Sequence, residues 1–133
     1  MKILILDDCE FRHAAFTEKF GKPGYELTHV RTAQEAINRL KAGGFDVVFL
    51  DHDLGGQVFV ASGAGTGYEV ADWLAKNEAQ KPAVVVIHTL NPAGQDAMKK
   101  ALPDAALWPF AWMPDDPKVL SVSACPQPSS TAN

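Results

Sequence analysis

Residues 45–55 read FDVVFLDHDLG, and this stretch decides the fold. Its centre, residues 47–50 (VVFL), is short, uninterrupted and apolar, which is typical of a parallel strand buried on both faces. The polar residues Asp51, His52 and Asp53 follow at once. Ligands of parallel α/β sheets bind outside the carboxyl ends of the strands. The stretch therefore predicts a central strand and a site beside it.

Two further apolar runs end in the same way. Residues 3–6 (ILIL) run into Asp7 and Asp8, and residues 83–87 (AVVVI) run into His88 and Thr89, with Asn91 close behind. The strand patterns over 25–30 and 105–110 are weaker and indicate sheet edges; in the second, proline 109 has no N–H for strand pairing. Polar side chains from several strands are therefore expected to meet in one crevice.

Amphipathic helices are expected between the strands. Apolar residues recur at helical spacing over residues 10–20, 32–42, 66–77 and 91–102. Thr32 and Glu35 form a capping box, and Asn91 before Pro92 is typical of a helix start. The alternating order predicts one α/β domain over residues 1–122 with helices on both faces of a parallel sheet. Residues 115–120 are expected to add one short helix at most, and residues 123–133 to form a flexible tail.

Composition narrows the class of protein. A chain of 133 residues with 47% hydrophobic residues has enough core for one globular domain. The net charge of -4 argues against a broad basic face for duplex DNA, while a small anionic ligand remains open. The amino terminus has neither a signal peptide pattern nor a membrane span, so we expect a cytoplasmic protein that does not act on membranes. The two cysteines, Cys9 and Cys125, suggest neither a disulfide framework nor a zinc site.

The paired acids Asp7 and Asp8 open the candidate site. Adjacent carboxylates after a first strand commonly hold a divalent cation such as magnesium or raise one another's pKa. The other interpretation is a cap at the start of the next helix. In extended geometry Asp51 and Asp53 share one face of their strand and His52 takes the other, unless a turn begins there.

Two histidines suggest acid and base catalysis. His52 and His88 end separate strands, and two imidazoles at a common reactant can exchange a proton with it. That arrangement suits phosphoester chemistry without an obligatory metal. The alternative for His52 is a core histidine whose hydrogen bonds are satisfied within the protein.

Three residues are candidates for phosphate binding: Arg12, Thr89 and Asn91. A guanidinium matches phosphate oxygens, and the helix start at Asn91 is a natural anion site. Arg12 can equally pair with Asp8 or Glu10, and Asn91 can be a plain cap. The glycine-rich loop 55–67 lacks the lysine of a phosphate-binding loop, so we expect a mobile hinge or lid. His13 and His29 receive no role, and Trp108 is expected in the core.

The strand order and the acids together resemble the response-regulator receiver domains. Their flavodoxin-like fold implies a three-layer domain with five parallel strands in the order 2-1-3-4-5, here with the last helix short or missing. The likeness aligns Asp51 with the phosphoacceptor and Asp7 and Asp8 with the magnesium-binding acids. Receivers carry a lysine before a proline at the end of the fifth strand, whereas Trp108 precedes Pro109 here.

The chain is similar in more detail to the cyclic-phosphate processing receiver domains. That family has strings similar to LDD with a nearby arginine, DHDLG, GY(D/E) and H(S/T)xNP. Matching strings occur here at residues 6–8 with Arg12, at 51–55, at 67–69 and at 88–92, and Met98 follows them. The likeness spans about residues 1–102 and implies processing of a cyclic phosphate on a nucleotide or at an RNA end.

These observations lead to a functional hypothesis with one alternative. The hypothesis is a phosphoesterase that opens a cyclic phosphate, with His52 and His88 as acid and base and Arg12, Thr89 and Asn91 on the phosphate. Asp51 and Asp53 would orient the histidines, and Asp7, Asp8 and Asp51 would be the ligands if a metal were bound. The alternative is a receiver-like module that binds a phosphorylated ligand or a protein partner without turnover.

Overall fold

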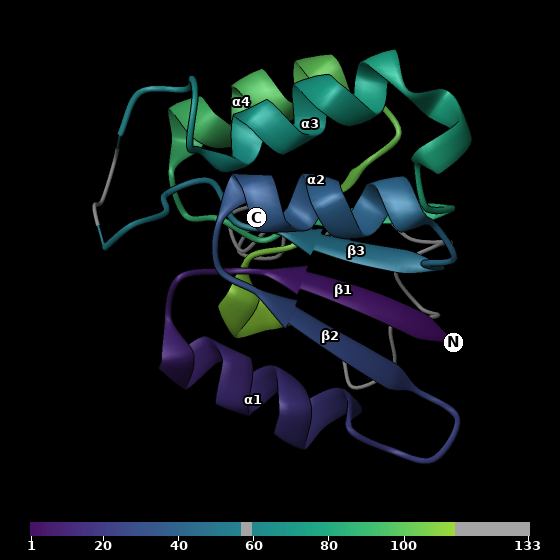
Figure 1. Ribbon diagram of the computed structural model, residues 1–133. Helices are drawn as coiled ribbons and strands as arrows, with labels where there is room; N and C mark the ends of the chain where they lie inside the picture. Colours follow the sequence, from purple (N-terminus) through teal and green to yellow (C-terminus); the bar gives the residue numbers. More distant parts are fainter. Residues whose placement is uncertain (57–59, 114–133) are drawn as a thin grey trace, which may run out of the picture.

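Five parallel strands form one sheet in the order β2-β1-β3-β4-β5 (Figure 1). The computed structural model describes residues 1–56 and 60–113. The strands are β1 (Lys2–Leu6), β2 (Glu26–Val30), β3 (Val47–Leu50), β4 (Val84–Ile87) and β5 (Ala106–Leu107). The predicted flavodoxin-like order and the edge positions of the two weaker strands are confirmed.

Within the described residues, four α-helices cover the sheet on both faces. They are α1 (Glu10–Phe20), α2 (Ala33–Ala42), α3 (Gly67–Lys76) and α4 (Pro92–Ala101), with short 3-10 turns at η1 (Glu78–Gln80) and η2 (Phe110–Trp112). Helix α1 lies on one face, whereas α2, α3 and α4 lie on the other (Figure 1). The predicted capping box of Thr32 and Glu35 and the cap by Asn91 are both present.

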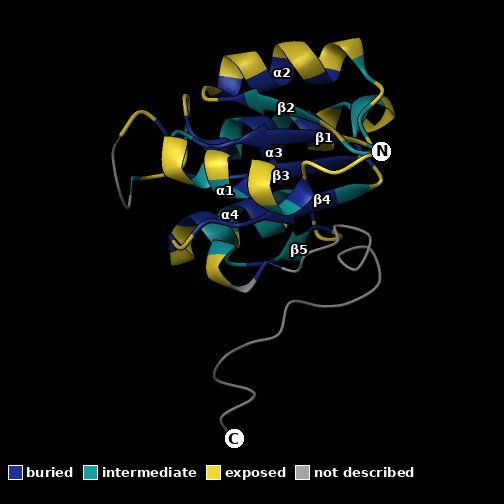
Figure 2. Cartoon of the chain, turned by 90° about the horizontal axis from the view of Figure 1, so that it is seen from below, coloured by how far each residue is buried: buried dark blue, intermediate teal, exposed yellow. Residues whose placement is uncertain are grey.

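Alternate residues of the central strands feed two separate cores. In β1, Leu4 and Leu6 pack under α2, α3 and α4, while Ile3 and Ile5 face α1. In β3, Leu50 belongs to the first core and Phe49 to the second. The apolar runs are continuous in sequence because both faces of these strands are covered. Figure 2 shows the buried strands between helices whose outer surfaces are exposed.

The face under α1 is completed by the segment after β5. Trp108 is buried there with Met113, as expected for a core tryptophan. The short helix and the tail predicted beyond residue 114 lie outside the described residues, as do residues 57–59 of the glycine-rich loop. Within the described parts of the chain, no helix is long and apolar enough to cross a membrane.

Candidate active site

The centre of the site is a row of three residues just beyond the ends of β1, β3 and β4, which we call the rung: Asp7, Asp51 and His88. Asp7, Asp51 and His88 each follow the last residue of a strand, and those last residues are register partners: Leu6, Leu50 and Ile87. Because successive side chains alternate between faces, all three polar groups turn toward the α1 side. One ligand atom from each lies within 4.8 Å of the others. The sheet therefore brings together residues that are far apart in sequence.

The Asp7 carboxylate is fully buried and accepts hydrogen bonds from several neighbouring groups. It accepts two hydrogen bonds from Arg12, through Nε at 2.7 Å and Nη2 at 2.8 Å. It also accepts from His88 Nε2 at 2.8 Å and from the backbone N–H of Cys9 at 2.8 Å. Burial by itself would raise the pKa of Asp7, but the hydrogen bonds from His88 and Arg12 outweigh it and hold that pKa well below its usual range. Asp7 is therefore ionised.

Asp51 lies beside Asp7 but has fewer hydrogen-bond donors, and its pKa shifts in the opposite direction. Its carboxylate accepts from the backbone N–H of His52 at 2.9 Å and from Arg12 Nη2 at 3.3 Å. Burial raises the pKa of Asp51 above its usual range, and the positive neighbours only partly offset this. The pKa values of the two neighbouring carboxyl groups thus shift in opposite directions, because Asp7 has the stronger set of donors.

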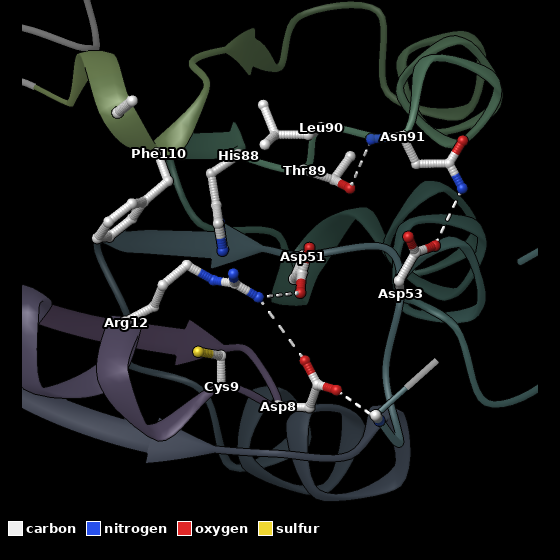
Figure 3. A pocket seen from close by; sticks show the side chains of 12 residues that line it. Asp8, Cys9, Arg12, Asp51, Asp53, His88, Thr89, Leu90, Asn91 and Phe110 are labelled. Atoms are coloured by element: carbon white, nitrogen blue, oxygen red, sulfur yellow. Dashed lines mark hydrogen bonds and ion pairs between the residues drawn. The ribbon is translucent and has the colours of Figure 1, made fainter. Parts of the chain in front are cut away.

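Arg12 lies in the first turn of α1, and its side chain contacts these acids. Its Nη2 atom lies 2.8 Å from Asp7. The same atom lies 3.3 Å from Asp51 and 3.8 Å from Asp8 (Figure 3). The hydrogen bonds to Asp7 raise the pKa of Arg12 further above its usual value. Its main partner is thus Asp7, which was not predicted. Of the two predicted partners, Asp8 forms the longer ion pair at 3.8 Å, and Glu10 pairs with Arg31 instead.

The resemblance to receivers implies a magnesium ion between these acids, and the residues do not fit one. Both oxygens of Asp7 and both oxygens of Asp51 already accept hydrogen bonds from groups of the chain. The Arg12 guanidinium supplies the positive charge between them. Magnesium also prefers an all-oxygen octahedron, whereas the third member of the cluster is the imidazole of His88.

His88 is buried and held in one orientation. Its Nε2 faces the Asp7 carboxylate, and its ring makes edge contacts with Phe16 and Phe49. A carboxylate only accepts, so we assign the proton to Nε2. Nδ1 is the only buried side-chain nitrogen or oxygen within residues 1–56 and 60–113 that has no hydrogen-bond partner. A buried polar atom of this kind needs an explanation, such as a water, a ligand or a catalytic role.

These groups line a pocket of about 420 Å³ at the carboxyl ends of the strands (Figure 3). The wall contains Arg12, Asp51 and His88 on one side and an apolar part that includes Leu90 and Phe110. Leu90 is 69% exposed, which is unusual for a leucine at a pocket. The remaining lining residues are Asp8, Cys9, Asp53, Gly56, Thr89, Asn91 and Ala111. The volume falls within the range typical of small-molecule sites.

His52 does not share this pocket. Its side chain is fully buried and lies against α4, where a Cβ added at Gly94 would come within 2.5 Å of the ring. Its Nδ1 lies 2.8 Å from Asp53 Oδ1, and its Nε2 lies 2.8 Å from Ser62 Oγ. The alternation along the strand places Asp51 on one face and His52 on the other. The structure therefore does not bring the two predicted catalytic histidines to a common reactant.

Thr89 and Asn91 line the pocket but serve mainly to shape it. Asn91 Oδ1 accepts from Gly94 N at the start of α4, and its Nδ2 donates to Asp53 Oδ1 at 3.0 Å. Thr89 Oγ1 accepts from the backbone N–H of Asn91 at 3.1 Å. The plain-cap interpretation of Asn91 thus describes its contacts, because its amide is already committed within the protein.

Two features of the site escaped sequence reasoning. Ser62, in the glycine-rich loop, is the partner of His52, although nothing in its spacing marks it. Asp8 is tied through its carboxylate to the backbone N–H of Gly56 at 2.6 Å, which fixes the start of that loop near the pocket. Apolar and glycine-rich loop residues carry no periodic signal, so only coordinates could place them.

Structural comparisons agree on the fold. A CheY-like receiver domain from Methanospirillum hungatei JF-1 matches with a TM-score of 0.61 and 20% identity, covering 80% of this chain and 78% of that one. The response regulator TrrA from Thermotoga maritima, solved with Mg²⁺ and BeF, gives 0.61 and 22%, covering 80% and 84%. A sensor protein from Polaromonas sp. JS666 gives 0.66 and 16%, covering 90% of each chain. At these identities the likeness establishes a receiver fold.

Sequence comparison adds the family. No curated protein matches the chain. The family model described as cyclic-phosphate processing receiver domain matches residues 2–104, which include β1 to β4 together with Asp7, Arg12, Asp51 and His88. The chain belongs to the cyclic-phosphate processing receiver domain family.

Proposed function

We propose that this protein is a phosphoesterase that opens a cyclic phosphate on a nucleotide or at an RNA end. The observation that carries the proposal is His88, which is tied through Nε2 to an ionised carboxylate, has a buried Nδ1 without a hydrogen-bond partner, and lines the same pocket as Arg12. Family membership supports the substrate class. The centre is the rung of Asp7, Asp51 and His88 with Arg12.

His88 serves as the general base. With its proton on Nε2 facing Asp7, the Nδ1 lone pair can accept a proton from an attacking water. Asp7 orients the ring and stabilises the imidazolium that forms, as a carboxylate partner of a catalytic histidine does. The aromatic contacts from Phe16 and Phe49 keep the ring from turning away.

Asp51 serves as the general acid. Its raised pKa means that it holds a proton more readily than an ordinary carboxyl group. In the proposed step the water oxygen bonds to phosphorus, one ring P–O bond breaks, and Asp51 gives its proton to the departing sugar oxygen. Arg12, whose Nη2 already faces Asp51, is the cation in reach of the phosphate oxygens. Cation, acid and base then surround one phosphorus atom.

The pocket wall suits a nucleotide better than a bare phosphate. Leu90 and Phe110 give it an apolar and aromatic part, on which a base or sugar can pack. The acids nearby disfavour a highly charged ligand, whereas a cyclic phosphodiester carries a single negative charge.

The test is hydrolysis of 2′,3′-cyclic and 3′,5′-cyclic nucleotides, followed by chromatography of the linear products. We expect turnover that is unchanged by EDTA, and a loss of about 100-fold or more in His88→Gln, the usual size of a general-base effect. His29→Gln, a histidine of the edge strand β2 outside the pocket, is the matched control and should retain activity.

Three results would overturn the proposal. If His88→Gln still hydrolysed cyclic nucleotides at the wild-type rate, His88 would not be the general base. Stabilisation of the wild type against heat by a cyclic nucleotide, with no product formed, would favour the receiver-like binding module instead. A mass gain on Asp51 after incubation with acetyl phosphate and magnesium would point to phosphotransfer signalling.

A further inference from the structure

Ser62, His52 and Asp53 form a continuous hydrogen-bonded chain, of which only Asp53 lines the pocket of the proposed phosphoesterase. Ser62 Oγ lies 2.8 Å from His52 Nε2, and His52 Nδ1 lies 2.8 Å from Asp53 Oδ1. Ser62 is exposed, His52 is fully buried, and Asp53 is half-buried between them and the pocket. The order hydroxyl, imidazole, carboxylate is that of an activated serine.

The protons in this chain can be assigned from the chemistry of the groups. The Asp53 carboxylate accepts from Asn91 Nδ2 at 3.0 Å and from the backbone N–H of Val60 at 3.3 Å. Two groups lie at His52 Nδ1: Asp53 Oδ1 at 2.8 Å and Asn91 Nδ2 at 3.3 Å. The shorter contact is to the carboxylate, which only accepts, so we assign the ring proton of a neutral His52 to Nδ1. Nε2 then carries the lone pair, so the Ser62 hydroxyl donates to it. This is the tautomer that accepts a proton from a serine.

The imidazole is held in place by close packing. An added Cβ at Gly94 of α4 would lie 2.5 Å from Cγ and 2.9 Å from Nδ1 of the His52 ring. The ring thus sits directly on the helix backbone, and Asp53 is itself anchored by the cap residue Asn91. A base that is fixed by packing and by a carboxylate is oriented before any substrate arrives.

The serine opens toward a second hollow, which shares no lining residue with the proposed phosphate pocket. This groove of about 590 Å³ lies between α3 and α4 and is lined by Ser62, Tyr68, Asp72, Ala75, Asp96, Ala97, Lys100 and Ala101. Its lysine is paired with Asp96 at 3.0 Å, and Asp72 is paired with Lys76 at 2.9 Å. Two acids and one paired lysine in the wall disfavour an anionic phosphate and favour an uncharged ester.

We propose that Ser62 is a nucleophile for carboxylic esters, with His52 as its base and Asp53 as the residue that positions the base. Ser62 Oγ bonds to the ester carbonyl carbon while its proton passes to His52 Nε2. The ester C–O bond then breaks, and the same proton passes to the departing alcohol oxygen. Water, deprotonated in turn by His52, releases the acid and restores the serine. This activity does not depend on the phosphate chemistry proposed above.

The experiment is labelling of the full chain with a fluorophosphonate probe, with the labelled residue mapped by mass spectrometry. The chain supplies its own control, because its other serines are Ser121, Ser123, Ser129 and Ser130, all near the carboxyl end. We expect Ser62 to be labelled at least about 100-fold faster than these, and p-nitrophenyl acetate to be hydrolysed with the same dependence on Ser62.

Variants separate activation from mere exposure. His52→Gln and Asp53→Asn should each slow labelling of Ser62 by about 100-fold or more, since each interrupts the chain of hydrogen bonds at a different link. Thermal unfolding of both variants checks that they remain folded. Because the two variants break different hydrogen bonds, the test still works if one of them does not fold.

Three outcomes would overturn the inference. They are labelling of Ser62 no faster than the carboxyl-terminal serines, equal labelling of Ser62 in folded His52→Gln, and loss of cyclic-nucleotide hydrolysis in Ser62→Ala. The last would show that the two sites are one. Absence of probe labelling alongside normal cyclic-nucleotide turnover would count against this inference alone and leave the phosphoesterase intact.

Discussion

At the scale of single residues, the site depends on the different sets of donors around two buried, neighbouring carboxyl groups. Asp7 is surrounded by donors, and its pKa is lowered; Asp51 has fewer donors, and its pKa is raised. Asp7 is therefore held as an anion, whereas Asp51 binds a proton more readily than an ordinary carboxyl group does. Arg12 bridges both, so its charge stabilises the whole group.

Replacing these two aspartates by asparagine should change stability in opposite directions. Asp7→Asn removes a stabilising charge, so the free energy of unfolding at pH 7 should fall by about 3 kcal/mol. Asp51→Asn removes a carboxylate that burial penalises, so the free energy of unfolding at pH 7 should rise. Urea unfolding at constant ionic strength measures both changes.

The two aspartates should make stability depend on pH in opposite directions. Because the pKa of Asp7 is below its ordinary 3.8, the folded state gains stability above that value and loses it as the pH falls below. The raised pKa of Asp51 has the reverse effect, a loss of stability as the pH rises above 3.8. Asp7→Asn should flatten the acid limb of the stability profile, and an unchanged limb would contradict this account.

Removal of Arg12 should convert the cluster into a cation site. Arg12→Ala leaves the buried Asp7 without its main partner and should lower the free energy of unfolding by about 3 kcal/mol. Oxygens that the guanidinium occupied then become free for a divalent ion. Magnesium should therefore raise the unfolding temperature of Arg12→Ala while leaving the wild type and the exposed-arginine control Arg39→Ala unchanged.

Single residues also show where sequence reasoning reaches its limit. Alternation continued past the end of β3 correctly separates Asp51 from His52, and the same rule applied to β4 places His88 with Asp51. It fails at Asp53, which lies 2.8 Å from His52 Nδ1 because the chain has left the strand. The pairing of Arg12 with Asp7 was not predictable, because a long side chain has several rotamers that reach different acids. Ser62 was missed because its position depends on a loop without any periodic pattern.

At the scale of elements, the helices and the central strands were predictable and the irregular segments were not. Hydrophobic periodicity and caps located all four α-helices to within a residue or two. The strand expected over 105–110 contracts to β5 (Ala106–Leu107), since the N–H of Trp108 still bonds to Ile87 O but Pro109 ends the pairing. The 3-10 turns carry no sequence period and were not predicted.

The approach of α3 to the end of β3 leaves no room for a side chain at Gly67. An added Cβ would lie 1.7 Å from the backbone oxygen of Asp51. Gly67→Ala should therefore displace the helix start and lower the free energy of unfolding by about 3 kcal/mol. Gly63→Ala is the matched control in the same loop, because no atom lies within 4 Å of its added Cβ. Guanidinium unfolding of both variants distinguishes packing from loop entropy.

At the scale of the whole molecule, the two cores share one sheet and should unfold together. Phe49 faces the core under α1, and Leu50 faces the core under the other three helices. Phe49→Ala and Leu50→Ala should each lower the free energy of unfolding by about 3 to 5 kcal/mol through loss of buried surface and creation of a cavity.

Each of these variants should still show a single transition by tryptophan fluorescence and by circular dichroism. Val84→Ala, at the partly exposed start of β4, is the milder control. Two separate transitions in either core variant would show that the faces fold independently, contrary to the shared sheet.

The rung that carries Asp7, Asp51 and His88 has a consequence for engineering. The lateral distance between these positions is set by interstrand backbone pairing, about 4.8 Å per strand, and not by the side chains themselves. A designer can therefore exchange one reactive group for another without re-spacing the others. The backbone thus fixes the spacing of positions 7, 51 and 88, and single substitutions at these three positions should be enough to introduce a different chemistry.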